Sequence, residues 1–119
     1  MLTMTKVQMI KANGRFVGFK ASGHTGYAAA GKDIVCAGVS TLVQTTVLGL
    51  ERIVGINPHL EQEKKSGYFA CSLPSVLEQE QLIKADLLFN LMYLGLQQIA
   101  AEFPKYVGIS IKEVEKNEV

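Results

Sequence analysis

Two residues of the 119-residue chain, Cys36 and His24, could together form the reactive pair of a thiol hydrolase. Cys36 stands where a glycine-rich segment leads into a long apolar stretch, and His24 follows a glycine earlier in that segment. A thiol in the first turn of a helix lies near unpaired N–H groups and the positive end of the helix dipole, and both favour the thiolate. A thiolate with an imidazole in reach is the minimum apparatus for nucleophilic attack on a carbonyl.

The residues around Cys36 supply further groups that this chemistry needs. Asp33 is a predicted helix N-cap, which makes Cys36 the third helical residue and leaves the junction amides free to bind an oxyanion. Ser40, one turn further along the same face, could hydrogen-bond the sulfur or the junction backbone. Two plainer interpretations stay open: a cysteine in an apolar helix is often core filler, and capping alone explains Asp33 as well as orientation of His24 does.

The remaining cysteine and histidine have simpler interpretations. Cys71 lies in the apolar run 68–73 and is a predicted core residue, whereas His59 follows a proline and is expected on the surface. Neither these two nor the reactive pair show the short paired spacing of zinc ligands, so we expect no metal. We also expect no cofactor, because the glycines of the segment match neither a P-loop nor a dinucleotide fingerprint; they are Gly23, Gly26 and Gly31.

The composition is that of one globular domain, which we expect to span residues 1–119. Hydrophobic residues make up 48% of the chain, enough for a core of its own. Twelve basic and eleven acidic side chains nearly cancel, so no broad field attracts nucleic acid or an anionic membrane. No run approaches the roughly 20 uninterrupted apolar residues of a membrane span, and the first residues lack the pattern of a signal peptide. We therefore expect a cytoplasmic protein with free thiols.

The N-terminal half predicts a hairpin followed by a helix. The Asn13-Gly14 pair is the strongest short hairpin signal, because a type I′ turn needs positive φ at both central positions, and it joins strands over 6–12 and 15–21. Residues 22–32 hold three glycines and a run of alanines without an apolar period, which is typical of a loop. Residues 34–54 are apolar almost all round, which predicts a buried helix in spite of many β-branched side chains.

The C-terminal half predicts a second hairpin, a second helix and a last strand. Residues 59–65 alternate charge with little apolar content, as an exposed edge strand does, and a Ser-Gly turn leads into a strand over 68–73. Ser75 and Glu78 form a capping-box pattern after a proline, and the helix should run to Phe103, where another proline stops it. An alternating stretch after that proline predicts the final strand.

The predicted order of elements is ββαββαβ, an α+β fold. Sheet and helices must cover each other's apolar faces, so we expect a layered sandwich of a largely antiparallel sheet and two main helices. The second helix carries more apolar surface than one sheet face can cover, and a subunit interface is the expected place for the remainder. Its apolar residues are Leu87, Leu88, Leu91, Met92, Leu94, Leu96 and Ile99.

Two motifs together resemble the ribosomal-processing cysteine protease family, called Prp. They are Ser22-Gly23-His24-Thr25-Gly26-Tyr27 and Gly31-Lys32-Asp33-Ile34-Val35-Cys36-Ala37-Gly38-Val39-Ser40. Either motif alone is weak, whereas the Gly-His and Asp-x-x-Cys elements are specific in combination. The likeness extends over nearly the whole chain, through 90–100, the helix end at Phe103-Pro104 and the closing strand.

The resemblance implies a homodimeric cysteine protease of the cytoplasm. Its substrate would be the precursor of large-subunit ribosomal protein twenty-seven, whose N-terminal extension is removed by a cut after a pair of phenylalanines. By position, Cys36 matches the nucleophile, His24 the base, and Asp33 and Ser40 polar positions beside them. The glycine-rich segment matches one that orders over substrate, with Thr25 where many members have alanine; its matching residues are Gly23, Thr25, Gly26, Tyr27 and Gly31.

Two other functions stay open at this point. One is a non-catalytic, ribosome-associated binding module that holds the same ribosomal protein without cutting it. Near-neutral charge argues against direct contact with RNA in that case. The other is a small thiol-dependent acyl transferase, which would form the same covalent intermediate and pass the acyl group to an acceptor other than water.

Overall fold

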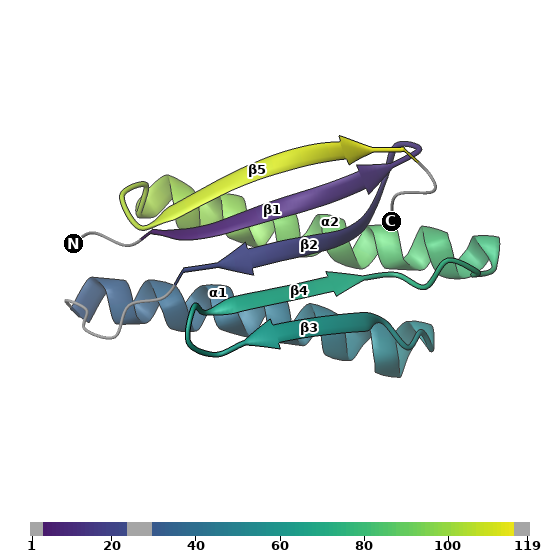
Figure 1. The fold of residues 1–119 in the computed structure, drawn as a ribbon. Coiled ribbons are helices and arrows are strands. Elements are labelled where there is room, and N and C mark those ends of the chain that lie inside the picture. Colours follow the sequence, from purple (N-terminus) through teal and green to yellow (C-terminus); the bar gives the residue numbers. More distant parts are fainter. Residues whose placement is uncertain (1–3, 24–29, 116–119) are drawn as a thin grey trace.

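Alternating apolar side chains build a five-stranded sheet, and two helices cover one face of it (Figure 1). The computed structural model describes residues 4–23 and 30–115. Over these residues the element order is ββαββαβ, as predicted, with a π-helical extension, η1, at the end of the first helix. The bounds are β1 Thr5–Ala12, β2 Arg15–Ser22, α1 Ala30–Gly49, η1 Leu50–Val54, β3 His59–Glu63, β4 Tyr68–Ser72, α2 Gln79–Glu102 and β5 Val107–Val114.

The sheet is mixed, with the order β3-β4-β2-β1-β5. Both hairpins and the β2 to β4 pairing are antiparallel, whereas β5 joins β1 in parallel. The predicted turn between β1 and β2 is confirmed, because Asn13 and Gly14 have φ of 54° and 77°. The edge position of β3 is also confirmed, since all five of its residues are exposed. The prediction of a largely antiparallel α+β sandwich is therefore correct, and β5 makes the sheet mixed.

The core lies between the sheet and the helices. Met9 faces Phe19 across the first hairpin, Phe19 faces Cys71 on the next strand, and all three side chains are buried. The ring of Phe19 meets that of Phe89 on α2 with centroids 6.3 Å apart. Helix α1 buries every fourth residue along one stripe, which consists of Val35, Val39, Val43 and Val47. This stripe fixes how α1 is turned about its own axis.

Helix α1 begins earlier than its sequence pattern predicts. It starts at Ala30, so the predicted loop over 22–32 is wrong at its end, and Asp33 is the fourth helical residue instead of the N-cap. Alanine has the highest helix propensity, and no proline follows Ala30 to stop the helix from forming there. The helical stretch reaches Val54 as predicted, but its last turn is a π-helix closed by Gly55 at φ 79°.

Helix α2 uses a different cap from the predicted one. Its N-cap is Glu78, whose backbone N–H donates to Gln81 Oε1 at 3.1 Å while the Glu78 side chain accepts from the N–H at position 81. The pattern at Ser75 and the pattern at Glu78 have the same spacing, and the structure uses the second. The expected end is confirmed, because α2 stops at Glu102, two residues before a proline.

One helical segment, residues 34–54, is long and apolar enough to cross a membrane by length and composition alone, with a mean hydropathy of 1.5. The expectation concerned uninterrupted apolar runs, and this segment is interrupted by Gln44, Glu51 and Arg52. In the described fold this segment buries its valine stripe and Leu50 in the core that it shares with the sheet and α2. The core helix of a globular domain passes the same test of length and composition.

Candidate active site

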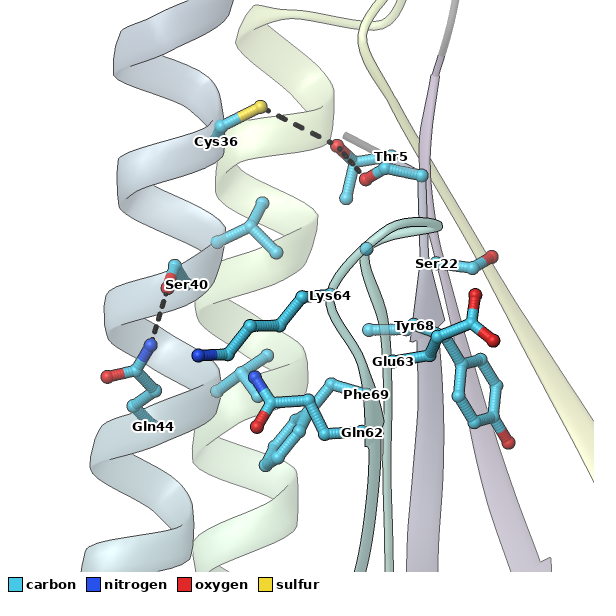
Figure 2. A pocket seen from close by; sticks show the side chains of 15 residues that line it. Thr5, Ser22, Cys36, Ser40, Gln44, Gln62, Glu63, Lys64, Tyr68 and Phe69 are labelled. Carbon is cyan, nitrogen blue, oxygen red and sulfur yellow. Dashed lines mark hydrogen bonds between the residues drawn. The ribbon is translucent and has the colours of Figure 1, made fainter. Parts of the chain in front are cut away.

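Cys36 lies on α1 with its sulfur turned toward the start of β1 (Figure 2). The neighbouring Val35 is buried, and because successive helical residues point about 100° apart, Cys36 emerges at the edge of the core. Its side chain is partly exposed. The Sγ atom lies 3.9 Å from Thr5 Oγ1, within hydrogen-bond reach for sulfur.

Thr5 also connects this thiol to the end of β2. Its hydroxyl donates to the Gly23 carbonyl at 3.3 Å, and its backbone N–H donates to the Tyr106 carbonyl at 2.9 Å. Gly23 has φ of 88°, and a Cβ there would overlap the Met4 carbonyl oxygen, so only glycine fits. The structure therefore brings Gly23 and Cys36 together through a residue that the sequence pattern did not single out.

A pocket of about 660 Å³ opens beside the thiol, between α1 and the β3–β4 hairpin. We call it the Cys36 pocket. Its apolar wall consists of the buried Val39 and Val43 and the half-buried Phe69. Polar side chains from α1 and from the hairpin face one another across it in Figure 2; among them are Ser40, Gln44, Gln62 and Lys64. A cleft with apolar walls and polar groups at its margin suits an extended peptide.

Ser40 lies one turn after Cys36 on the same side of α1, as predicted, and lines the Cys36 pocket. The hydrogen bond that Ser40 Oγ accepts comes from Gln44 Nε2 at 2.8 Å, a further turn away from the thiol. Ser40 thus contributes a polar patch to the pocket wall. No hydrogen bond from Ser40 to the sulfur is found among the described residues.

The start of α1 lies further from the sulfur than the sequence pattern predicts. Because the helix begins at Ala30, Cys36 is its seventh residue instead of its third, and Gly31 is the second. The unpaired N–H groups belong to the first four residues of the helix, and the dipole effect falls off within the first turn. In this structure that electropositive end is therefore about one turn away from Cys36.

Four residues of the predicted site lie outside the described residues: His24, Thr25, Gly26 and Tyr27. The separation between the thiol and the imidazole is therefore not described. The structure does place the two chain positions that flank residues 24–29. Gly23 lines the Cys36 pocket, and Ala30 begins the helix that carries the thiol.

Cys71 is a core residue, as predicted. It lies on β4 opposite Phe19 and is 2% exposed. Burial, with a smaller contribution from the Glu51 carboxylate, raises the pKa of the Cys71 thiol to about 12. This thiol stays protonated at neutral pH, which is the opposite of what a nucleophile requires.

His59 lies on the surface, as predicted, on the exposed edge strand β3. Its Nε2 is 3.6 Å from Glu61 Oε1, and both side chains are largely exposed. Across residues 4–23 and 30–115, no group of three His, Cys, Asp or Glu side chains is arranged to hold a metal ion.

Sequence reasoning missed three contributors to this site, namely Thr5, Gln44 and the β3 residues that line the pocket. None of them carries a motif. Gln44 lies on α1 two turns after Cys36, whereas Thr5 and the β3 residues reach the thiol only because the assembled sheet packs beside α1. That pairing of distant segments leaves no local sequence signal.

Comparisons with known proteins agree on one family. The family model described as cysteine protease Prp matches residues 4–108. The ribosomal processing cysteine protease Prp of Bacillus subtilis strain 168 is 34% identical over 85 residues, which cover 71% of this chain and 76% of that protein.

Two solved structures share the fold. SMU.848 from Streptococcus mutans superposes with a TM-score of 0.84 at 30% identity, covering 94% of this chain and 97% of that one. The ribosomal processing protease Prp from S. aureus, in complex with a substrate peptide, superposes with a TM-score of 0.79 at 22% identity, covering 92% and 100%.

The different surroundings of the two thiols predict different rates of alkylation. At pH 8 a thiol with a pKa of about 12 is thiolate in only about one molecule in ten thousand, and Cys71 is also inaccessible. We expect iodoacetamide to label Cys36 at least about 100-fold faster than Cys71 in the native protein. Mass spectrometry of tryptic peptides measures both rates. Unfolding in guanidinium should bring the two rates together. Equal rates in the native protein would contradict the assignment of Cys36 as the accessible thiol and Cys71 as the core thiol.

Proposed function

This chain belongs to the cysteine protease Prp family, and we propose that it removes the N-terminal extension from the precursor of large-subunit ribosomal protein twenty-seven. The single observation that carries this proposal is a partly exposed thiol, Cys36, beside a peptide-sized pocket with an apolar wall. The cut would follow a phenylalanine. The B. subtilis relative is a ribosomal processing protease by name, which supports this choice of substrate.

In the proposed reaction Cys36 is the nucleophile and His24 the base. His24 takes the proton of the Cys36 thiol, the sulfur attacks the peptide carbonyl, the carbonyl oxygen becomes an oxyanion, and the imidazolium gives that proton to the leaving amine. Water then hydrolyses the thioester and releases the acid, which restores the thiol. Gly23 lines the Cys36 pocket, so the chain enters residue 24 from the edge of this site, which supports His24 as the base.

The remaining assignments follow the family resemblance. Asp33 stands in the first turn of α1 and Ser40 on the pocket wall, and we assign both a supporting role. We assign contact with substrate to the glycine-rich segment that precedes Asp33. Its residues are Gly23, Thr25, Gly26, Tyr27 and Gly31. Because this chemistry needs only side chains and water, the proposal includes no metal and no cofactor.

Substrate selection is proposed to take place on the apolar wall of the Cys36 pocket. Val39, Val43 and Phe69 offer aliphatic and aromatic surface beside the sulfur, which suits an aromatic side chain next to the cut bond. The volume of about 660 Å³ lies within the usual range of ligand pockets, roughly 300–1,000 Å³. A pocket of this size has room for more than one side chain of the substrate.

The protein is proposed to act as a homodimer. Four large apolar side chains of α2 are between 51% and 69% exposed and lie at helical spacing on one side, so they form a stripe that water would otherwise cover. We call them the α2 stripe: Ile83, Leu87, Leu91 and Leu94. A second copy of the chain would present the same stripe and cover it symmetrically.

The protein is further proposed to work in the cytoplasm as one domain over residues 1–119. Ribosomal protein precursors are made in that compartment, and two free cysteines fit its reducing conditions. The net charge of +1 offers no broad field for nucleic acid or an anionic membrane. The partner is therefore the precursor peptide itself.

Cleavage of a defined peptide tests the function directly. We expect the wild-type protein to cut a precursor-like peptide after adjacent phenylalanines and Cys36→Ala to lose at least about 1,000-fold in kcat/KM, because no other group replaces the nucleophile. Cys71→Ala is the matched control and should retain activity, since Cys71 lies in the core. Mass spectrometry of the digest identifies the cut bond.

Two results would overturn this proposal. A peptide that binds the wild-type protein but stays intact would make the chain a binding module. A peptide that stays intact while an activated ester acylates Cys36 would make it an acyl transferase.

The pocket assignment predicts a pair of contrasting substitutions on β3. Gln62 lines the Cys36 pocket, whereas Glu61 is its exposed neighbour on the other face of the strand. Gln62→Trp narrows the pocket without touching the core, and we expect it to lower kcat/KM for the phenylalanine peptide about tenfold or more. Glu61→Trp should stay within about twofold, because its surface ion pair contributes little. Equal effects of the two changes would count against this pocket.

The α2 stripe predicts a change of oligomeric state on substitution. Leu91→Glu places a carboxylate in the centre of the stripe, and we expect the protein to become a monomer, since an unpaired buried charge costs several kcal/mol. Leu60→Glu is the control, because Leu60 is a 40% exposed leucine on β3, at the sheet edge opposite β5. Light scattering after size exclusion measures the mass. A Leu91→Glu protein with the mass of the wild type would rule out this interface.

A further inference from the structure

The Thr5 hydroxyl lies between two acceptors and has one proton to give. It is 3.3 Å from the Gly23 carbonyl oxygen and 3.9 Å from Cys36 Sγ (Figure 2). A hydroxyl carries a single hydrogen and two lone pairs, so it donates to one partner and accepts from the other. Which partner receives the hydrogen depends on whether the sulfur carries a proton of its own.

With Cys36 as a thiol, both contacts are satisfied at once. The S–H group donates to Thr5 Oγ1, and Thr5 donates to the Gly23 carbonyl. A thiolate has no hydrogen and only accepts, so the first contact then requires the Thr5 hydrogen to point at the sulfur. Hydrogen bonds to an ionised partner are about twice as strong as neutral ones, which favours this second arrangement once the proton has left.

We propose that Thr5 is a positioning residue for Cys36, whose hydroxyl rotates from the Gly23 carbonyl to the sulfur as the thiol loses its proton. The thiol proton leaves to water or to the catalytic base, and Thr5 keeps its own hydrogen. This inference rests on the proposed function, in which Cys36 is the nucleophile. The hydroxyl holds the thiolate in place and shares its charge before substrate arrives.

The surrounding backbone holds the Thr5 hydroxyl and the Gly23 carbonyl oxygen in place beside Cys36 Sγ. Thr5 pairs with Val107 of β5, and its N–H is bound to the Tyr106 carbonyl. The N–H of Gly23 donates to the Ser66 carbonyl at 3.3 Å, and the closeness of Met4 leaves no room for a side chain. Since Thr5 is also branched at Cβ, rotation about its C–O bond is the one inexpensive motion.

The test compares variants that leave the other groups around the pocket unchanged. The titratable side chains among the described pocket residues are Glu63, Lys64 and Tyr68, all from the β3–β4 hairpin side. The neighbouring described polar residues of α1, Ser40 and Gln44, carry no charge. A change at Thr5 alone isolates the contribution of its hydroxyl.

Three variants of Thr5 and one control separate the hydroxyl from the rest of the side chain. Thr5→Val replaces the hydroxyl by a methyl group of similar size, Thr5→Ser keeps it, and Thr5→Ala differs from Thr5→Ser by one oxygen. Thr46→Val is the matched control, because Thr46 is a buried threonine whose hydroxyl donates to the Leu42 carbonyl at 2.8 Å within α1. The rate of Cys36 alkylation by iodoacetamide is measured from pH 5 to pH 10, and peptide cleavage in parallel.

We expect Thr5→Val to slow Cys36 alkylation at pH 7 about tenfold, as for loss of one hydrogen bond to a charged group. Thr5→Ser should stay within about threefold of wild type, and Thr46→Val should be unchanged. In cleavage, kcat should fall with KM nearly constant, because Thr5 acts on the nucleophile and not on substrate binding. If Thr5→Val does not melt cooperatively, Thr5→Ser against Thr5→Ala makes the same comparison.

The inference is overturned if folded Thr5→Val follows the wild-type alkylation curve, or if Thr5→Ser is slowed as much as Thr5→Ala. Its failure is distinct from that of the proposed function. Wild-type cleavage with no effect of Thr5→Val ends the inference and leaves the protease assignment intact. Slower Cys36 alkylation in Thr5→Val, with no cleavage by wild type, supports the positioning of the thiol and ends the assignment of substrate.

Discussion

Burial of one valine stripe sets the position of the Cys36 thiol. Val35, Val39 and Val43 recur every fourth residue and pack into the core, which leaves α1 a single rotation about its axis. Cys36 and Ser40 each follow a stripe residue directly, so both emerge at the border between core and solvent, where the pocket opens. The packing that buries the valine stripe therefore also places a partly exposed thiol beside an apolar wall.

Wherever local pattern decides, the sequence predicts this structure well. The Asn13-Gly14 turn, the exposed edge strand and the core position of Cys71 each depend on a few neighbouring residues. The helix starts are harder, because Ala30 extends α1 past a plausible cap at Asp33, and competing capping patterns at α2 have the same spacing. Thr5 could not be found at all, since only the assembled sheet brings it to Cys36.

The two cysteines lie in opposite environments of the described fold. Cys71 lies opposite Phe19 in the sheet and keeps its proton because the core cannot solvate a thiolate and Glu51 adds like charge. Cys36 lies on the boundary, in contact with a hydroxyl and with an open pocket. Both cysteines stand in apolar runs, and that pattern predicts the core position of Cys71 but not the boundary position of Cys36.

The parallel pairing of β1 with β5 bears on when the surroundings of Cys36 can form during synthesis. These are the first and last strands of the described chain, and the backbone N–H of Thr5 is bound to the residue that precedes β5. During translation β1 emerges long before β5, so Thr5 lacks its backbone partner until that part of the chain has been made. The surroundings of the Cys36 thiol are therefore complete only once β5 has joined the sheet.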